Sequence, residues 1–268
     1  MVHRKTTRSS IIMNDSIISG FLSGKGGVGK SFIASNLATQ ITKKGYKVAI
    51  IDCDLGFSNI STFLNQKVNF TVIDWINQRA SLNDIIDITP QCSLITVSNN
   101  FDHNGVNNET LLNALDQLLN HLKLNYDFIL IDSPAGTPPI AFWILDVSNF
   151  SNLVLIDEPT SISDVYRLCK YVFNVKSDYK FNAIINQSKN ETDGLNTYDK
   201  FRSLVENFLK KEIAYLGQVY QKEIVADYLK TNQCLQIIED DKEIKNQFHI
   251  LSKNIIELTQ NSITNVIG

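Results

Sequence analysis

The chain has 268 residues, 43% of them hydrophobic and 20% charged, which predicts a folded domain with an extensive apolar core. Its net charge is −3, so the surface as a whole is not basic enough to indicate nucleic-acid binding. No apolar run approaches the length of a membrane span. The four cysteines show neither CxxC nor zinc-ligand spacing, which favours a reduced, cytoplasmic protein.

Residues 1–15 contain Arg4, Lys5 and Arg8 but lack the apolar segment of a signal peptide. We expect a mobile basic tail there, which either is simply solvated or touches an acidic partner. Residues 16–268 are expected to form one domain that ends in an amphipathic helix over residues 242–260.

Strand-like apolar runs alternate with helical patterns along this domain. The predicted strands cover residues 17–22, 48–51, 94–97, 128–131, 153–156, 181–185 and 215–219. The predicted helices between them cover residues 32–44, 110–122, 163–175 and 198–209. Because the strands lack in-and-out alternation, they indicate an α/β fold with a doubly wound, mainly parallel sheet and helices on both faces. Such a sheet binds its ligand at the carboxyl ends of the strands.

A glycine-rich segment, residues 23–31, lies between the first strand and the first helix. This order of strand, loop and helix is typical of a phosphate-binding loop (P-loop), in which backbone N–H groups and the helix N-terminus surround phosphates. Lys30 would neutralise phosphate charge, and the Ser31 hydroxyl would ligate Mg²⁺. A second lysine, Lys25, is unusual in such a loop. The predicted nucleotide-binding residues here are Gly24, Lys25, Gly26, Gly27, Val28, Gly29, Lys30, Ser31 and Phe32.

Asp52 and Asp54 follow the second strand, at the edge of the sheet where the phosphates would lie. Asp54 would orient or deprotonate the attacking water, and Asp52 would hold a Mg²⁺-bound water. The structural alternative for Asp54 is a cap on the following helix.

Asp132 ends the strand over residues 128–131 and is the expected acid that holds Mg²⁺ through water. The N–H group of Gly136, four residues later, would sense the γ-phosphate and make this segment a switch. Asn186, after the strand over residues 181–185, is either an amide that contacts adenine or an ordinary turn residue.

Three segments together resemble the MinD/ParA family of deviant Walker ATPases. They are Lys25-Gly26-Gly27-Val28-Gly29-Lys30-Ser31, then Asp52-Cys53-Asp54-Leu55-Gly56 with Asn59, then Asp132-Ser133-Pro134-Ala135-Gly136. Two further segments are similar to the flagellar-number ATPases FlhG and FleN: residues 158–166, and Tyr215-Leu216-Gly217 followed by Glu223-Ile224-Val225.

This resemblance implies a slow, Mg²⁺-dependent ATPase that hydrolyses ATP to ADP and phosphate and forms a homodimer with ATP. Lys25 would then reach the phosphates of the partner subunit, a role comparable to that of an arginine finger. The resemblance also implies a switch that controls the placement or number of a cellular structure, such as a flagellum or cell pole. Its protein partner would be an FlhF-like GTPase or a polar or basal-body protein.

The resemblance leaves two questions open. Members of the family often end in a helix that binds membrane, and Phe248, Leu251, Ile255 and Leu258 form one apolar stripe here. That stripe predicts either a helix packed on the sheet or peripheral contact with the inner face of the cell membrane. The alternative function is a ParA-type partitioning ATPase that binds DNA non-specifically, which the acidic composition disfavours.

Overall fold

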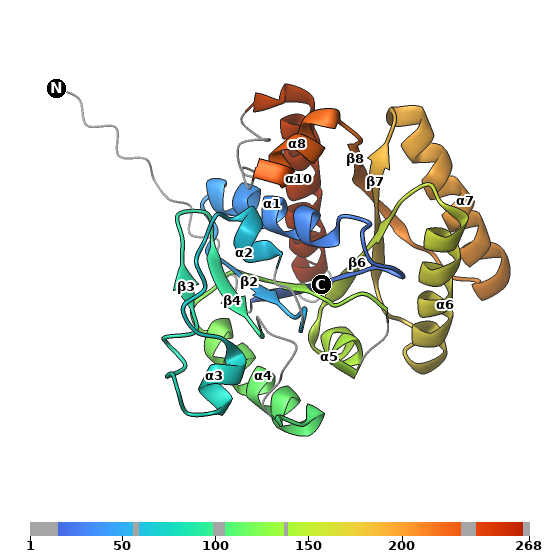
Figure 1. The fold of residues 1–268 in the computed structure, drawn as a ribbon. Coiled ribbons are helices and arrows are strands. Elements are labelled where there is room, and N and C mark those ends of the chain that lie inside the picture. Colours follow the sequence, from blue (N-terminus) through green and yellow to red (C-terminus); the bar gives the residue numbers. More distant parts are fainter. Residues whose placement is uncertain (1–15, 56–58, 99–104, 137–138, 232–239, 265–268) are drawn as a thin grey trace.

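The computed structural model describes residues 16–55, 59–98, 105–136, 139–231 and 240–264. Strands and helices alternate along the chain (Figure 1). The strands are β1 (Ile17–Leu22), β2 (Val48–Asp52), β3 (Asp87–Ile88), β4 (Ser93–Thr96), β5 (Phe128–Asp132), β6 (Phe150–Leu155), β7 (Phe181–Ser188) and β8 (Ala214–Tyr220). The helices are α1 (Lys30–Lys43), α2 (Ile60–Phe63), α3 (Val72–Ile76), α4 (Asn108–Lys123), α5 (Pro139–Val147), α6 (Pro159–Val175), α7 (Glu191–Leu209), α8 (Glu223–Thr231) and α10 (Lys242–Thr264).

Within these residues one eight-stranded sheet runs in the order β3-β4-β2-β5-β1-β6-β7-β8. Every neighbouring pair is parallel except β3 and β4, which are antiparallel. The predicted doubly wound, mainly parallel fold is therefore confirmed. In the register of β2 and β5, Asp52 lies opposite Asp132. The two residues therefore lie side by side at the same edge of the sheet.

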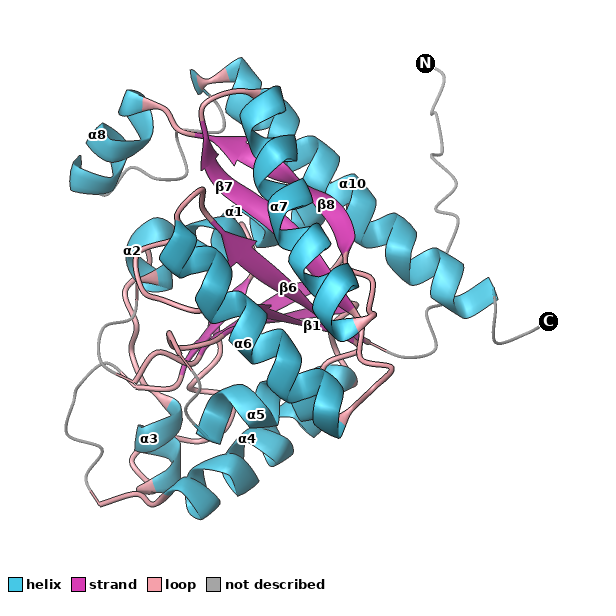
Figure 2. Cartoon of the chain, turned by 90° about the vertical axis from the view of Figure 1, so that its right-hand side faces the viewer, coloured by secondary structure: helices cyan, strands magenta, loops and turns pink. Residues whose placement is uncertain are grey.

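The core lies on both faces of the sheet, which explains why the strands read as continuous apolar runs. Phe21 of β1 packs with α1 and α10 on one face, whereas Ile18, three residues earlier in the same strand, packs with α4 and α5 on the other. A third cluster joins α6 and α7 to β6 and β7. Figures 1 and 2 show these helices on opposite sides of the strands.

Several predicted boundaries need correction. The strand expected over residues 94–97 lies one residue earlier, and β7 continues to Ser188, so Asn186 lies inside a strand and does not end it. α6 begins at Pro159 because proline suits the first helical turn, and α7 begins at Glu191 because Asn190 caps it. Several short elements were not predicted, namely α2, α3, β3, α5 and α8.

The C-terminal helix α10 packs along β8 and α1 (Figure 2). Phe248, Leu251 and Ile255 are completely buried, and Leu258 packs against the same cluster. In this structure the apolar stripe therefore faces the sheet, and membrane contact through it stays a prediction. The tail over residues 1–15 lies outside the described residues.

Candidate nucleotide-binding site

The glycine-rich loop connects β1 to α1 at the carboxyl edge of the sheet. Gly29 precedes α1 with a φ of 87°, a conformation that favours glycine, and a Cβ atom added there would lie 2.2 Å from Nδ2 of Asn186. Gly27 also has a positive φ, of 79°. The loop therefore needs glycine both for its turn and for its close approach to β7.

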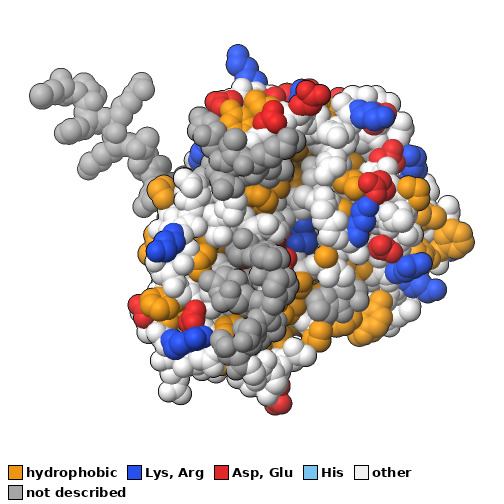
Figure 3. Space-filling model, viewed as in Figure 1, with side chains coloured by type: hydrophobic (Ala, Val, Ile, Leu, Met, Phe, Trp, Pro, Cys, Tyr) orange, Lys and Arg blue, Asp and Glu red, His pale blue; other side chains and the backbone are white. Residues whose placement is uncertain are grey.

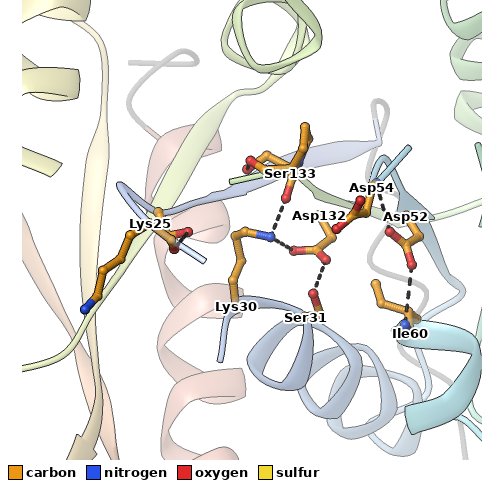
Figure 4. A network of polar contacts seen from close by, with 10 residues as sticks. Lys25, Lys30, Ser31, Asp52, Asp54, Ile60, Asp132 and Ser133 are labelled. Carbon is orange, nitrogen blue, oxygen red and sulfur yellow. Dashed lines mark hydrogen bonds and ion pairs between the residues drawn. The ribbon is translucent and has the colours of Figure 1, made fainter. Parts of the chain in front are cut away.

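A polar network at this edge of the sheet joins Ser31, which is partly buried, to the buried Lys30 and Asp132 (Figure 4). The Lys30 ammonium donates to Oδ1 of Asp132 over 2.8 Å and also to the carbonyl of Ser133. The Ser31 hydroxyl donates to Oδ2 of Asp132 over 2.5 Å. Because Asp132 is completely buried and Lys30 only 9% exposed, this charge pair is held in one arrangement.

Asp52 is buried beside this network and accepts hydrogen bonds from Asp54 and from the start of α2. Its Oδ1 accepts the N–H of Asp54 over 3.1 Å, and its Oδ2 accepts the N–H of Ile60 over 3.4 Å. Asp54 lines the cavity described below. Burial and the charges of Asp52 and Asp132 raise the pKa of the Cys53 thiol well above its usual value, so Cys53 is a neutral core residue.

Lys25 has different surroundings from Lys30, although the same loop carries both. Its side chain points away from the Asp132 network (Figure 4) and forms an exposed ion pair with Glu158, at the N-terminus of α6. Gly24 fixes this part of the loop against α6, since an added Cβ would lie 2.4 Å from Cβ of Asp164. The role of Glu158 as the partner of Lys25 could not be derived from residue spacing.

A cavity of about 810 Å³ lies along this edge. The face in Figure 3 is hollowed near its centre, where a basic side chain lies inside the hollow. The predicted residues that line the cavity are Lys25, Gly26, Gly27, Val28, Gly29, Lys30, Ser31, Phe32, Asp54 and Asn186. Four other predicted site residues do not line it: Gly24, Asp52, Asp132 and Gly136. Ala135, next to Gly136, does line the cavity.

Sequence reasoning missed the wall of the cavity that lies beyond the loop. This wall is lined by Lys189, which follows β7, by Tyr220, the last residue of β8, and by Gln221 and Lys222, which follow β8. Their position at carboxyl ends of parallel strands was the available signal. Asn186 lies against the loop itself, since its Nδ2 donates to the carbonyl of Val28 over 2.8 Å.

The residues present fit a magnesium ion bound together with phosphates. Ser31 and Asp132 bring a hydroxyl and a carboxylate together, and Asp52 stands beside them. Within the described ranges there is no cluster of three or more His, Cys, Asp or Glu side chains suited to a metal. Mg²⁺ keeps several water and phosphate ligands and needs few ligands from the protein. Four lysines line the cavity and suit an anionic ligand: Lys25, Lys30, Lys189 and Lys222.

Comparisons with known proteins agree with this geometry. The family model described as ParA, NUBPL iron-transfer P-loop NTPase, matches residues 16–256. The flagellum site-determining protein YlxH of Helicobacter pylori is 30% identical over 226 residues, covering 81% of this chain and 74% of YlxH. The antiactivator FleN of Pseudomonas aeruginosa is 29% identical, covering 75% of this chain and 72% of FleN.

Solved structures share the fold. The MinC:MinD cell division protein complex of Aquifex aeolicus matches with a TM-score of 0.72 and 20% identity, over 90% of this chain and 96% of that one. MinD of Pyrococcus horikoshii, solved with Mg-ADP, matches with a TM-score of 0.70 and 23% identity, over 91% of this chain and 97% of that one.

No helix in the described part of the chain has the length and apolar character that crossing a membrane requires. From the extent of the family match and the level of identity to YlxH, the chain belongs to the ParA/MinD family of P-loop nucleotidases.

Proposed function

We propose that this protein is a cytoplasmic, Mg²⁺-dependent ATPase switch that controls the placement or number of a cellular structure. The observation that carries the proposal is the complete network of Lys30, Ser31 and Asp132 beneath a cavity that Asp54 also lines. The similarity to YlxH and FleN supports a flagellum or cell pole as the structure concerned.

The residues divide the proposed reaction between them. Backbone N–H groups of the loop and the Lys30 ammonium would stabilise charge on the β- and γ-phosphates. Asp54 would orient the attacking water and accept its proton. Ser31 and Asp132 would hold Mg²⁺, with Asp52 acting through water, and the ion would neutralise phosphate charge.

Lys25 supports an ATP-dependent homodimer as the active state. Its ion pair with Glu158 is exposed to solvent, and exposed pairs exchange partners at small cost in free energy. Once released, its ammonium would reach the γ-phosphate of a partner subunit, which would link hydrolysis to assembly. The dimer would then present a surface to an FlhF-like GTPase or to a polar or basal-body protein, and hydrolysis would dissolve it.

Light scattering after size exclusion, with MgATP present, tests this proposal. We expect Asp54→Ala to form a stable dimer with ATP, because hydrolysis falls by about 10²- to 10⁴-fold while binding is kept. Adding Lys25→Ala should return that variant to a monomer. Lys200→Ala is the matched control, since Lys200 pairs with exposed Asp157 just as Lys25 pairs with Glu158. An Asp54→Ala chain that binds ATP and stays monomeric would contradict the switch.

A further inference from the structure

The wall of the cavity farthest from the P-loop is held in place by the C-terminal helix. This wall comprises the end of β8 and the start of α8, where Tyr220 and Lys222 line the cavity. Both ends of this short segment are bound to α10, which follows later in the chain and lines no part of the cavity itself.

Gln247 makes the first of these contacts. Its Oε1 accepts the backbone N–H of Tyr220 over 3.0 Å, and its side chain is only 7% exposed. The amide must be oriented this way, because only its oxygen can accept a hydrogen bond from an N–H group. A buried hydrogen bond to backbone restrains the strand end, so Gln247 helps to hold Tyr220 in its position at the cavity.

Glu243 makes the second contact, one helical turn before Gln247 and on the same side of α10. Its carboxylate forms an ion pair with the ammonium of Lys222. The start of the helix is itself fixed, since Oδ1 of Asp241 accepts the N–H groups of Glu243 and Ile244, each over 2.9 Å. Helix capping therefore fixes the backbone from which the Glu243 side chain extends.

Phe248 makes the third contact, with Phe32, a residue that lines the cavity. Its ring meets that of Phe32 edge to face, with centroids 5.7 Å apart and planes at 78°. Phe32 directly follows Ser31 and packs in the same way on Phe63 of α2, at 6.2 Å. Through Phe32, the first turns of α10 thus contact the residue next to the proposed magnesium ligand.

We infer that Glu243, Gln247 and Phe248 are positioning residues for the nucleotide, and that nucleotide binding and the docking of α10 stabilise each other. The inference rests on the proposed binding of ATP in this cavity. Coupling of this kind is reciprocal. The free energy by which docked α10 strengthens nucleotide binding equals the free energy by which bound nucleotide stabilises the docking of α10. A partner that displaces α10 would then release nucleotide.

Two substitutions in the full-length protein test the inference. Gln247→Met keeps the length of the side chain but removes the acceptor, and the dissociation constant for MgATP should rise about 10-fold. Glu243→Gln acts at an exposed pair and should raise it roughly 2- to 3-fold. Glu257→Gln is the matched control, because Glu257 is an exposed carboxylate of α10 that pairs with Lys253 away from the cavity.

Two further readouts separate positioning from a general loss of stability. The affinity for magnesium tripolyphosphate, which lacks a nucleoside to meet the far wall, should be the same in Gln247→Met as in the parent. Hydrogen exchange at the amides of residues 244–251 should slow when ATP binds to the parent, and much less in Gln247→Met.

The outcomes distinguish this inference from the proposed function. If the parent does not bind MgATP, or if Lys30→Met binds it equally well, the proposed function fails. If the parent binds ATP but Gln247→Met binds it with the same affinity, the inference alone is overturned. It is also overturned if ATP leaves exchange at residues 244–251 unchanged, or if Gln247→Met weakens tripolyphosphate as much as ATP.

Discussion

The two lysines of the glycine-rich loop lie in opposite surroundings. Lys30 is 9% exposed and donates to Asp132, which is completely buried. The Lys25 side chain is 30% exposed, and its partner Glu158 is 51% exposed. Removing one member of a buried pair leaves an uncompensated charge, whereas an exposed pair exchanges with water at little cost. The loop therefore combines a buried, fixed cation with a more exposed, releasable one.

The largest effect should follow from removing the fixed cation. Lys30→Met would leave the Asp132 carboxylate buried without its counter-charge, and we expect it to lower the free energy of unfolding by about 3–5 kcal/mol. It should also abolish measurable ATP binding. Urea unfolding and a nucleotide-binding titration measure the two effects.

The double variant Lys30→Met with Asp132→Asn is the control for that prediction. Removing both charges should restore most of the lost stability, because no unpaired charge is then buried, but it should not restore ATP binding. If Lys30→Met alone is as stable as the parent, the network is not the fixed element that its burial indicates.

The second effect concerns how the loop is held at its Lys25 end. Gly24→Ala would place a Cβ atom 2.4 Å from Cβ of Asp164 and 2.8 Å from the backbone of α6. The loop or the helix must move, so we expect a loss of about 1–3 kcal/mol in unfolding free energy. Gly26→Ala is the matched control, since its nearest neighbour would be 3.9 Å away. Equal stability of the two variants in the absence of nucleotide would show that the contact with α6 is unimportant.

The fixed end of the site was predictable from sequence, and the releasable end was not. Lys30, Ser31, Asp52 and Asp132 occupy local patterns, each at the end or start of an apolar strand or helix. Parallel strands bring such ends to one edge, so the network follows from the fold class alone. Glu158 belongs to another βα unit, and neither spacing nor periodicity relates it to Lys25.

The same reasoning explains the elements that were missed or misplaced. Continuous apolar runs identified the buried strands, and amphipathic periodicity identified α4 and α6. β3 has only two residues, and α2 only four, too few for any period to show. Asn186 was placed at a strand end because the apolar run stops at Ile185, yet pairing with β8 carries β7 on to Ser188. Tertiary pairing, which a single sequence does not display, decided that boundary.

The smallest effect on stability should come from breaking the exposed ion pair between Lys25 and Glu158. Glu158→Gln leaves Lys25 without its partner, and we expect the free energy of unfolding to change by less than about 1 kcal/mol. Dimerisation with ATP should nevertheless strengthen, since Lys25 no longer has to leave an ion pair before it reaches a partner's phosphate. Asp157→Asn is the control. Asp157 directly precedes Glu158, and its substitution releases Lys200 but leaves Lys25 paired. Sedimentation equilibrium of both variants, in the Asp54→Ala background with MgATP, compares them directly. If both variants dimerise like the Asp54→Ala parent, Glu158 does not restrain Lys25. Lys25 and Lys30 would then differ in burial but not in how readily each is released.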